Sequence, residues 1–353
     1  MTARPPEEAA RPGWRSAREI GAVAERAATL EAEEVTVRAS LRSEAQTRGV
    51  AAAQRDERFA SIRANIAACA PCVFFDWTRD AARSFGNEDA ARVMLAPIAA
   101  VIEGIRIIDD IQDEEVSCLA TEVGIERALV LASGAFGIAL ELLAELPLHG
   151  DAWRAAAASL GRGLRETAIG QELESAAPAG FDAFWEVVDR KTPPLAATAV
   201  ELGALAAGAA PEEAAALTSL AVPLGRLLQI SDDCLDALAD GASDWRTPRR
   251  NLLMAYALSG PNAVEIEALL ARGDDADALH DAQLALLRDG ALAYALHAQV
   301  STLAELKHKI DSLVLPDPRP FLRGAELRRY DVELLLRECG VRAELASRLT
   351  VLD

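Results

Sequence analysis

Residues 109–113 read Asp-Asp-Ile-Gln-Asp, and residues 232–236 read Asp-Asp-Cys-Leu-Asp. Each aspartate-rich cluster lies in an apolar stretch with a helical pattern, and on a helix residues i and i+4 share one face with i+1 close beside them. Carboxylates this close repel one another and are costly beside an apolar core, so we expect a cation between them. Hard oxygen ligands suit Mg²⁺, which keeps several waters and shares itself with substrate phosphates. The two clusters therefore predict a site that holds a phosphorylated substrate through metal ions.

The composition favours an all-α protein. Of the 353 residues, 51% are hydrophobic and only 5% are aromatic, and alanine and leucine dominate over β-branched residues. The formal net charge of −19 excludes nucleic acid and anionic membrane surfaces as natural partners. We find no apolar run long and charge-free enough to span a bilayer. Without a visible signal peptide, we expect a cytoplasmic protein.

The chain is predicted to form a bundle of long helices around a central apolar cavity. We expect a flexible tail over residues 1–14, the bundle over residues 15–314, and a C-terminal helical appendage over residues 315–353 after a proline-rich break. The apolar periodicity predicts helices over residues 88–113, 125–146, 153–174, 181–205 with an interruption at Pro193-Pro194, 212–239, 249–258, 263–270 and 275–313.

The second aspartate cluster ends the segment 225–236, Gly-Arg-Leu-Leu-Gln-Ile-Ser-Asp-Asp-Cys-Leu-Asp. This segment resembles the G-x-x-F-Q-I-x-D-D-x-x-D segment of trans-isoprenyl diphosphate synthases, the polyprenyl synthetase family. Four further segments resemble the family in the same order, over about residues 90–310: residues 109–113, residues 170–174 with Glu174 in place of an aspartate, Arg190-Lys191-Thr192 followed by Leu195, and residues 243–258. One such cluster is a weak signal, but five ordered segments are a strong one.

The resemblance implies the isoprenoid synthase type I fold, a homodimer, and three Mg²⁺ ions that bridge the two clusters to the diphosphate of an allylic prenyl substrate. Metal ions and cations would stabilise the charge that develops on the leaving diphosphate, and the apolar cavity would shield the carbocation from water. The resemblance implies metal binding by Asp109, Asp110, Asp113, Asp232, Asp233 and Asp236. All of these except Asp236 are implied to be catalytic, together with Lys191. The implied substrate-binding residues are Lys191, Thr192, Gln171, Gln229 and Arg249.

A local aromatic cluster precedes the first aspartate cluster. Phe74, Phe75 and Trp77 could line the substrate cavity and stabilise cations, or they could form plain core. The polar residues also have possible roles that are purely structural. Lys191 could be a surface lysine, Gln171 could form a hydrogen bond between helices, and either acidic cluster could be a solvated helix face.

One half of the family's site is missing from the sequence. Chain-elongating members bind isopentenyl diphosphate with an N-terminal G-K-R segment and an arginine pair just after the first aspartate cluster. Residues 114–120 read Glu-Glu-Val-Ser-Cys-Leu-Ala, which would repel a second diphosphate. The sequence thus predicts a class I terpene synthase or cyclase that ionises one allylic diphosphate. The alternatives are a chain-elongating prenyl diphosphate synthase, a prenyltransferase with another acceptor, and a non-catalytic partner subunit.

Overall fold

All the regular secondary structure in the described part of the chain is helical. The computed structural model describes residues 73–113, 119–176, 180–238, 251–272, 276–338 and 342–350, and these ranges contain no strand, which confirms the all-α prediction. The predicted tail over residues 1–14 lies outside them. The helices are α3 Val73–Ser84, α4 Glu88–Gln112, α5 Leu119–Val123, α6 Ile125–Ala144, α7 Gly150–Ser175, α8 Phe181–Lys191, α9 Pro193–Ala206, α10 Pro211–Ala216, the 3₁₀ helix η2 Leu217–Leu220, α11 Ala221–Leu238, α12 Leu252–Leu258, α13 Ala263–Leu270, α14 Ala276–Arg288, α15 Ala291–Ser312, α16 Arg319–Glu338 and α17 Ala343–Leu349.

Helix boundaries follow local chemistry. The side chain of Asn87 accepts a hydrogen bond from the backbone N–H of Ala90 and so caps α4. Pro193 begins α9, where its missing N–H costs no helical hydrogen bond, so the predicted interruption of helix 181–205 is confirmed. The predicted helix over residues 275–313 is wrong in one respect. It breaks into α14 and α15 because Gly290 adopts a left-handed conformation with φ of 81°.

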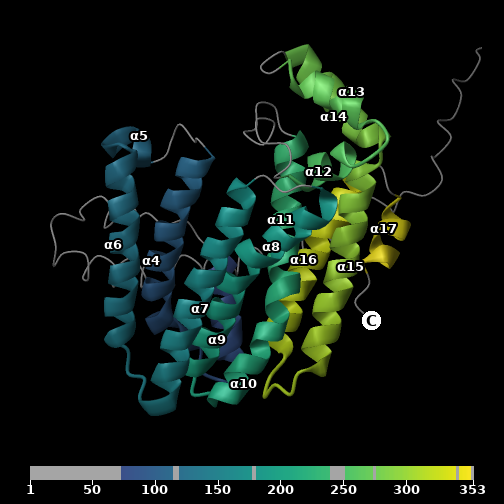
Figure 1. Ribbon diagram of the computed structural model, residues 1–353. Helices are drawn as coiled ribbons and strands as arrows, with labels where there is room; N and C mark the ends of the chain where they lie inside the picture. Colours follow the sequence, from purple (N-terminus) through teal and green to yellow (C-terminus); the bar gives the residue numbers. More distant parts are fainter. Residues whose placement is uncertain are drawn as a thin grey trace, which may run out of the picture.

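The long helices pack side by side as a bundle (Figure 1). Helix α4 packs along α6, α3 packs against α9, and α9 also contacts α7 and α11. A close approach lies at Gly203 of α9, where an added Cβ would sit 2.1 Å from the backbone oxygen of Thr78 in α3. Only a residue without a side chain allows α3 and α9 to come this near. Helix α9 is thus the central helix of the core.

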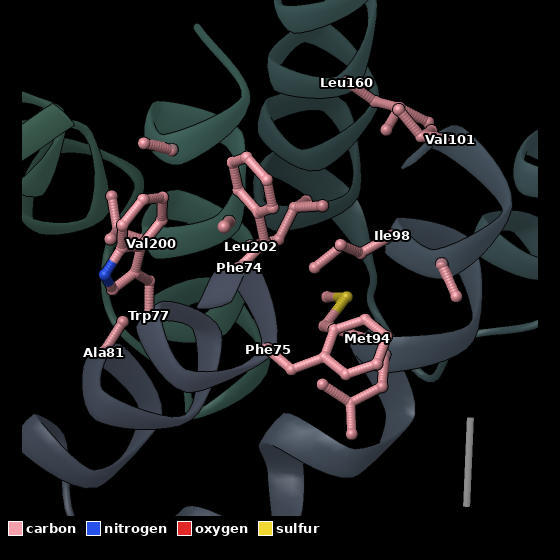
Figure 2. Close-up of a cluster of buried hydrophobic side chains, with 14 of the residues drawn as sticks. Phe74, Phe75, Trp77, Ala81, Met94, Ile98, Val101, Leu160, Val200 and Leu202 are labelled. Atoms are coloured by element: carbon pink, nitrogen blue, oxygen red, sulfur yellow. The ribbon is translucent and has the colours of Figure 1, made fainter. Parts of the chain in front are cut away.

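A small apolar cavity lies between α3, α4, α7 and α9. Its volume is about 10 Å³, and a chain entering it would have to displace the lining side chains. The aromatic residues of α3 differ in their relation to it: Phe74 lines the cavity, whereas Phe75 and Trp77 do not. In Figure 2 the rings of Phe75 and Trp77 leave α3 in different directions, toward Met94 and Val200 respectively, and both are buried in the core. The lining residues are Phe74, Ile98, Val101, Ile102, Leu160, Leu195, Thr198 and Ala199.

The C-terminal segment joins the bundle. Helix α16 contacts α15 and α3, and its residues Phe321 and Ala325 belong to the main core. The predicted boundary after residue 314 therefore falls inside the packed structure, and residues 315–353 include a helix of the bundle itself.

Two stretches are long and apolar enough to cross a membrane by length and composition alone. They are Ile125–Ala144 and Pro211–Cys234, with mean hydropathies of 1.7 and 1.3. This corrects the expectation that no run would meet such a test. Both stretches pack into the bundle, α6 against α4 and α11 against α9 and α15. Each stretch therefore buries one side against neighbouring helices.

Candidate active site

The ends of three helices meet around a half-buried ammonium group. Lys191, the last residue of α8, places its Nζ 2.9 Å from Oδ1 of Asp109 on α4 and 2.7 Å from Oε2 of Glu174 on α7. Gln171 of α7 donates from Nε2 to the same oxygen of Asp109 at 2.5 Å. One predicted metal ligand and two predicted substrate contacts thus form a single hydrogen-bonded cluster with Glu174, which we call the Lys191 cluster.

The backbone around Lys191 explains how α7 and α8 come so close. An added Cβ on Gly170 would lie 2.6 Å from the backbone carbonyl of Arg190 and 2.7 Å from the nitrogen of Lys191. Glycine therefore permits the contact that brings Gln171 beside Asp109. The hydroxyl of Thr167 donates to the backbone oxygen of Lys191 at 3.1 Å. Gly170 thus has a packing role, and the neighbouring Gln171 has a polar one.

Electrostatics keep Lys191 charged. Burial by itself would lower the pKa of the ammonium group, but the carboxylates of Asp109 and Glu174 outweigh burial and raise the pKa above its ordinary value. The cluster thus carries two negative charges and one positive charge in a partly desolvated place. Such a cluster can accept further positive charge, for example from divalent cations.

The second residue of the first cluster has a different partner. Asp110 receives a hydrogen bond from Nη1 of Arg106 at 2.9 Å, and the same guanidinium holds Glu103 through two further contacts of 3.0 and 3.3 Å. The Asp110 side chain is 12% exposed, against 33% for Asp109. Asp113 is half-buried and caps the C-terminal end of α4, where its backbone N–H donates to the backbone oxygen of Asp109. The three predicted ligands therefore lie together on one helix end but differ in environment.

In the second cluster, Asp233 is buried inside the protein. It is 2% exposed, and its carboxylate accepts hydrogen bonds from Nε2 of Gln229 at 2.7 Å and from the backbone N–H of Leu252 at 2.8 Å. Its backbone oxygen accepts from Nδ2 of Asn251, which also caps α12. Asp233 thus anchors the start of α12 to α11, and Gln229 contacts this anchor.

The remaining predicted residues lie at the same end of the bundle or outside the described ranges. Asp232 and Asp236 are exposed on α11. Figure 1 shows the C-terminal ends of α4, α7 and α11 at one end of the bundle. Thr192 links α8 to α9 and is half-buried. Arg249 lies outside the described residues.

The side chains present suit a hard divalent cation that is shared with a substrate. Within the described ranges, no three His, Cys, Asp or Glu side chains converge closely enough to hold an ion by themselves. Mg²⁺ needs no such cage, because it takes water and phosphate oxygens as the rest of its ligands. The donor set is all oxygen, and Oε1 of Gln171 is a buried acceptor without a hydrogen-bond partner, close to Asp109. These features fit Mg²⁺ at this end of the bundle.

Reasoning from the sequence missed three residues of this region. Glu174 was noted only as a replacement in a motif, yet it is the nearer of the two carboxylates to Lys191. Arg106 stands four residues before Asp110, a spacing that indicates an ion pair on a helix. Asn251 precedes an apolar run and could have been recognised as a helix cap.

We predict that Asp233→Asn lowers the free energy of unfolding of the metal-free protein by about 1–3 kcal/mol, because an amide cannot accept both hydrogen bonds now made to the carboxylate. The exposed Asp232→Asn and Asp236→Asn are the matched controls and should stay within about 0.5 kcal/mol of the natural protein. Chemical denaturation measures all three. Equal stability of Asp233→Asn and the two controls would contradict the anchoring role.

Comparisons with known proteins identify the family of the chain. A family model described as polyprenyl synthetase matches residues 77–280. The chain is 25% identical to geranylfarnesyl diphosphate synthase of Natronomonas pharaonis over 248 residues, which cover 65% of this chain and 71% of that protein. It is 31% identical to nonaprenyl diphosphate synthase of Mycobacterium tuberculosis over 147 residues, which cover 39% and 43%.

Solved structures show the same fold. Geranylgeranyl pyrophosphate synthetase from Pyrococcus horikoshii superimposes with a TM-score of 0.73 at 18% identity, covering 85% of this chain and 99% of that one. Geranylgeranyl pyrophosphate synthase from Corynebacterium glutamicum, complexed with calcium and isoprenyl diphosphate, gives a TM-score of 0.67 at 21% identity, covering 88% and 97%. The family match extends over more than half of the chain. The protein therefore belongs to the polyprenyl synthetase family of trans-isoprenyl diphosphate synthases and is an enzyme of the prenyltransferase class.

Proposed function

We propose that this enzyme elongates an allylic prenyl diphosphate with isopentenyl diphosphate, releasing inorganic diphosphate and forming a longer prenyl diphosphate. The observation that carries the proposal is the Lys191 cluster, which joins Asp109, Gln171 and Glu174 at one end of the bundle. The relatives with curated names are both prenyl diphosphate synthases of chain-elongating type. They favour elongation over the cyclase that the sequence predicted.

The small apolar cavity marks the direction that the prenyl tail of the substrate would take, displacing the lining side chains as it enters. Its lining residues Ile98, Val101 and Ile102 belong to α4, the helix that ends in the first aspartate cluster. They precede Asp109 by 7 to 11 residues, which corresponds to roughly 10–16 Å along a helix. A diphosphate at the helix end would thus extend its hydrocarbon tail along α4, with Phe74 beside the inner cavity.

Divalent cations complete this proposed site. We assign three Mg²⁺ ions to the two aspartate clusters, Asp109, Asp110 and Asp113 at the end of α4 and Asp232, Asp233 and Asp236 on α11. Not every carboxylate is a direct ligand, since that of Asp233 is buried and held by protein donors. Bound there, the ions would neutralise charge that develops on the departing diphosphate.

The chain's own residues have separate tasks. Lys191 stays protonated and contacts the diphosphate, and Gln171 orients Asp109. We place Thr192 and Arg249 with the substrate-binding residues. The buried apolar side chains around Phe74 exclude water from the carbocation.

One observation favours a terpene cyclase as the second candidate. Glu114 and Glu115 follow the first cluster where elongating members carry arginines, so the cations for a second diphosphate are not evident in the sequence. A prenyltransferase with another acceptor shares this feature. A non-catalytic subunit would have no chemical reason to retain the two aspartate clusters, so their presence argues against this alternative.

Incubation of purified protein with Mg²⁺ and C10 to C25 allylic diphosphates, with and without isopentenyl diphosphate, tests these candidates together. Elongation predicts longer prenyl diphosphates only when isopentenyl diphosphate is present. Hydrocarbons or alcohols formed without it would establish the cyclase instead. The Lys191→Gln variant should lose at least about tenfold in kcat/KM in either case, since one charge-assisted contact to the leaving group is removed.

We also propose a homodimer through α6. This helix packs along α4 on one side, whereas its other side exposes Leu129, Val130 and Leu140, and Figure 1 shows it at the edge of the bundle. An apolar face of this kind suits a second copy of the same chain. The cytoplasmic location and the lack of a nucleic-acid partner stay predictions from composition.

Light scattering after gel filtration measures the oligomeric state. We predict that Leu129→Glu/Val130→Glu yields a monomer, because two charges would be buried without partners in the interface. The control is Val264→Glu on α13, which is also highly exposed and should leave the dimer intact. A monomeric natural protein, or a dimer that survives the double substitution, would contradict the proposal.

A further inference from the structure

We propose that Arg226 is a positioning residue that sets the place of Lys191 by holding Asp189. Arg226 lies on α11, at a variable position of the segment 225–236. Asp189 lies two residues before Lys191, in the last turn of α8. The inference rests on the proposed diphosphate site, in which Lys191 contacts the diphosphate, and it assigns a task to two residues outside both aspartate clusters.

The contact between Arg226 and Asp189 is bidentate. Nε of Arg226 donates to Oδ1 of Asp189 at 2.7 Å, and Nη2 donates to Oδ2 at 2.6 Å. Two parallel hydrogen bonds between planar groups fix the orientation of the groups as well as their distance. The guanidinium carbon also lies 5.1 Å from the centre of the Trp185 ring, one turn earlier on α8, and Nε1 of Trp185 donates to the hydroxyl of Tyr294 on α15. Arg226 is thus fixed to two residues of α8.

The residue before Arg226 brings α11 close to the junction between α8 and α9. An added Cβ on Gly225 would lie 2.8 Å from the backbone nitrogen of Pro193 and 2.7 Å from its Cγ. Glycine therefore permits this approach. Pro193 follows Lys191 by two residues, and Asp189 precedes it by two. Consecutive residues of α11 thus contact the chain on both sides of Lys191.

The last turn of α8 is held from two sides. A helix advances about 100° per residue, so side chains two residues apart leave it in nearly opposite directions. Asp189 is directed to α11, whereas Lys191 contacts Asp109 of α4 and Glu174 of α7. Without the contact on the α11 side, a small rotation or shift of this turn would move the ammonium group relative to the end of α4.

Calorimetric titration with inorganic diphosphate in the presence of Mg²⁺ tests the inference without turnover. Asp189→Asn should weaken diphosphate binding by about fivefold or more, because an amide can accept only one of the two hydrogen bonds from Arg226. Electrostatics alone predicts the opposite sign, since this substitution removes a negative charge near a site for an anion. Arg226→Lys, which keeps the charge and loses the planar fork, should also weaken binding.

A second background asks whether the effect passes through Lys191. If Asp189 and Arg226 act by placing the ammonium group, Asp189→Asn should change the affinity by less than about twofold once Lys191→Gln is present. The matched control is Arg162→Gln, which removes another arginine that pairs with a neighbouring helix, in this case with Glu201 of α9. The control should bind diphosphate as the natural protein does.

The outcomes separate two kinds of failure. If Lys191→Gln binds diphosphate as tightly as the natural protein, the proposed diphosphate site itself is wrong. If Lys191→Gln weakens binding but Asp189→Asn leaves it unchanged or strengthens it, the site stands and the role of Arg226 is wrong. A loss from Asp189→Asn that persists in full beside Lys191→Gln would also contradict that role. Thermal unfolding checks that each variant is folded, and Arg226→Lys decides the matter if Asp189→Asn is not.

Discussion

The half-buried ammonium of Lys191, paired with two carboxylates, is the interaction on which the rest of the site depends. It connects Asp109 of α4 with Glu174 of α7 from the end of α8, so one charge joins two consecutive helices to a third that lies far from them in sequence. The fold makes room for this contact at Gly170, where any side chain would strike the backbone of α8. A charge that is partly removed from water is stabilised by opposite charges beside it, so the two carboxylates and the ammonium stabilise one another.

From this centre the acidic residues divide by environment. Asp109 is held by Lys191 and Gln171, and Asp110 is held by Arg106. Asp233 is buried and is held by Gln229 and the backbone N–H of Leu252, whereas Asp232 and Asp236 are exposed. Part of the lining of the apolar cavity comes from α4, the helix that carries the first aspartate cluster at its end. Acidic and apolar residues are thus separated along one helix.

Much of the fold could be predicted from sequence because apolar periodicity and caps are local. Helix α4 was recognised to within a residue, and α13 at its ends. The turn at Gly290 was missed because the apolar pattern continues on both sides of it. The burial of Asp233 could not be foreseen, since it depends on the return of the chain at Leu252, nineteen residues later. The ion pair of Arg106 with Asp110 was within reach of the i, i+4 rule.

The most direct test of the account is the affinity of the metal-loaded protein for an unreactive prenyl thiodiphosphate, measured by calorimetry with Lys191→Gln beside the natural protein. If the ammonium organises the diphosphate site, the substitution weakens binding by about tenfold or more, or roughly 1.4 kcal/mol. Lys307→Gln, which removes a lysine paired with Asp311 on α15, leaves the affinity unchanged. Equal affinities of Lys191→Gln and the natural protein would contradict the central role of Lys191.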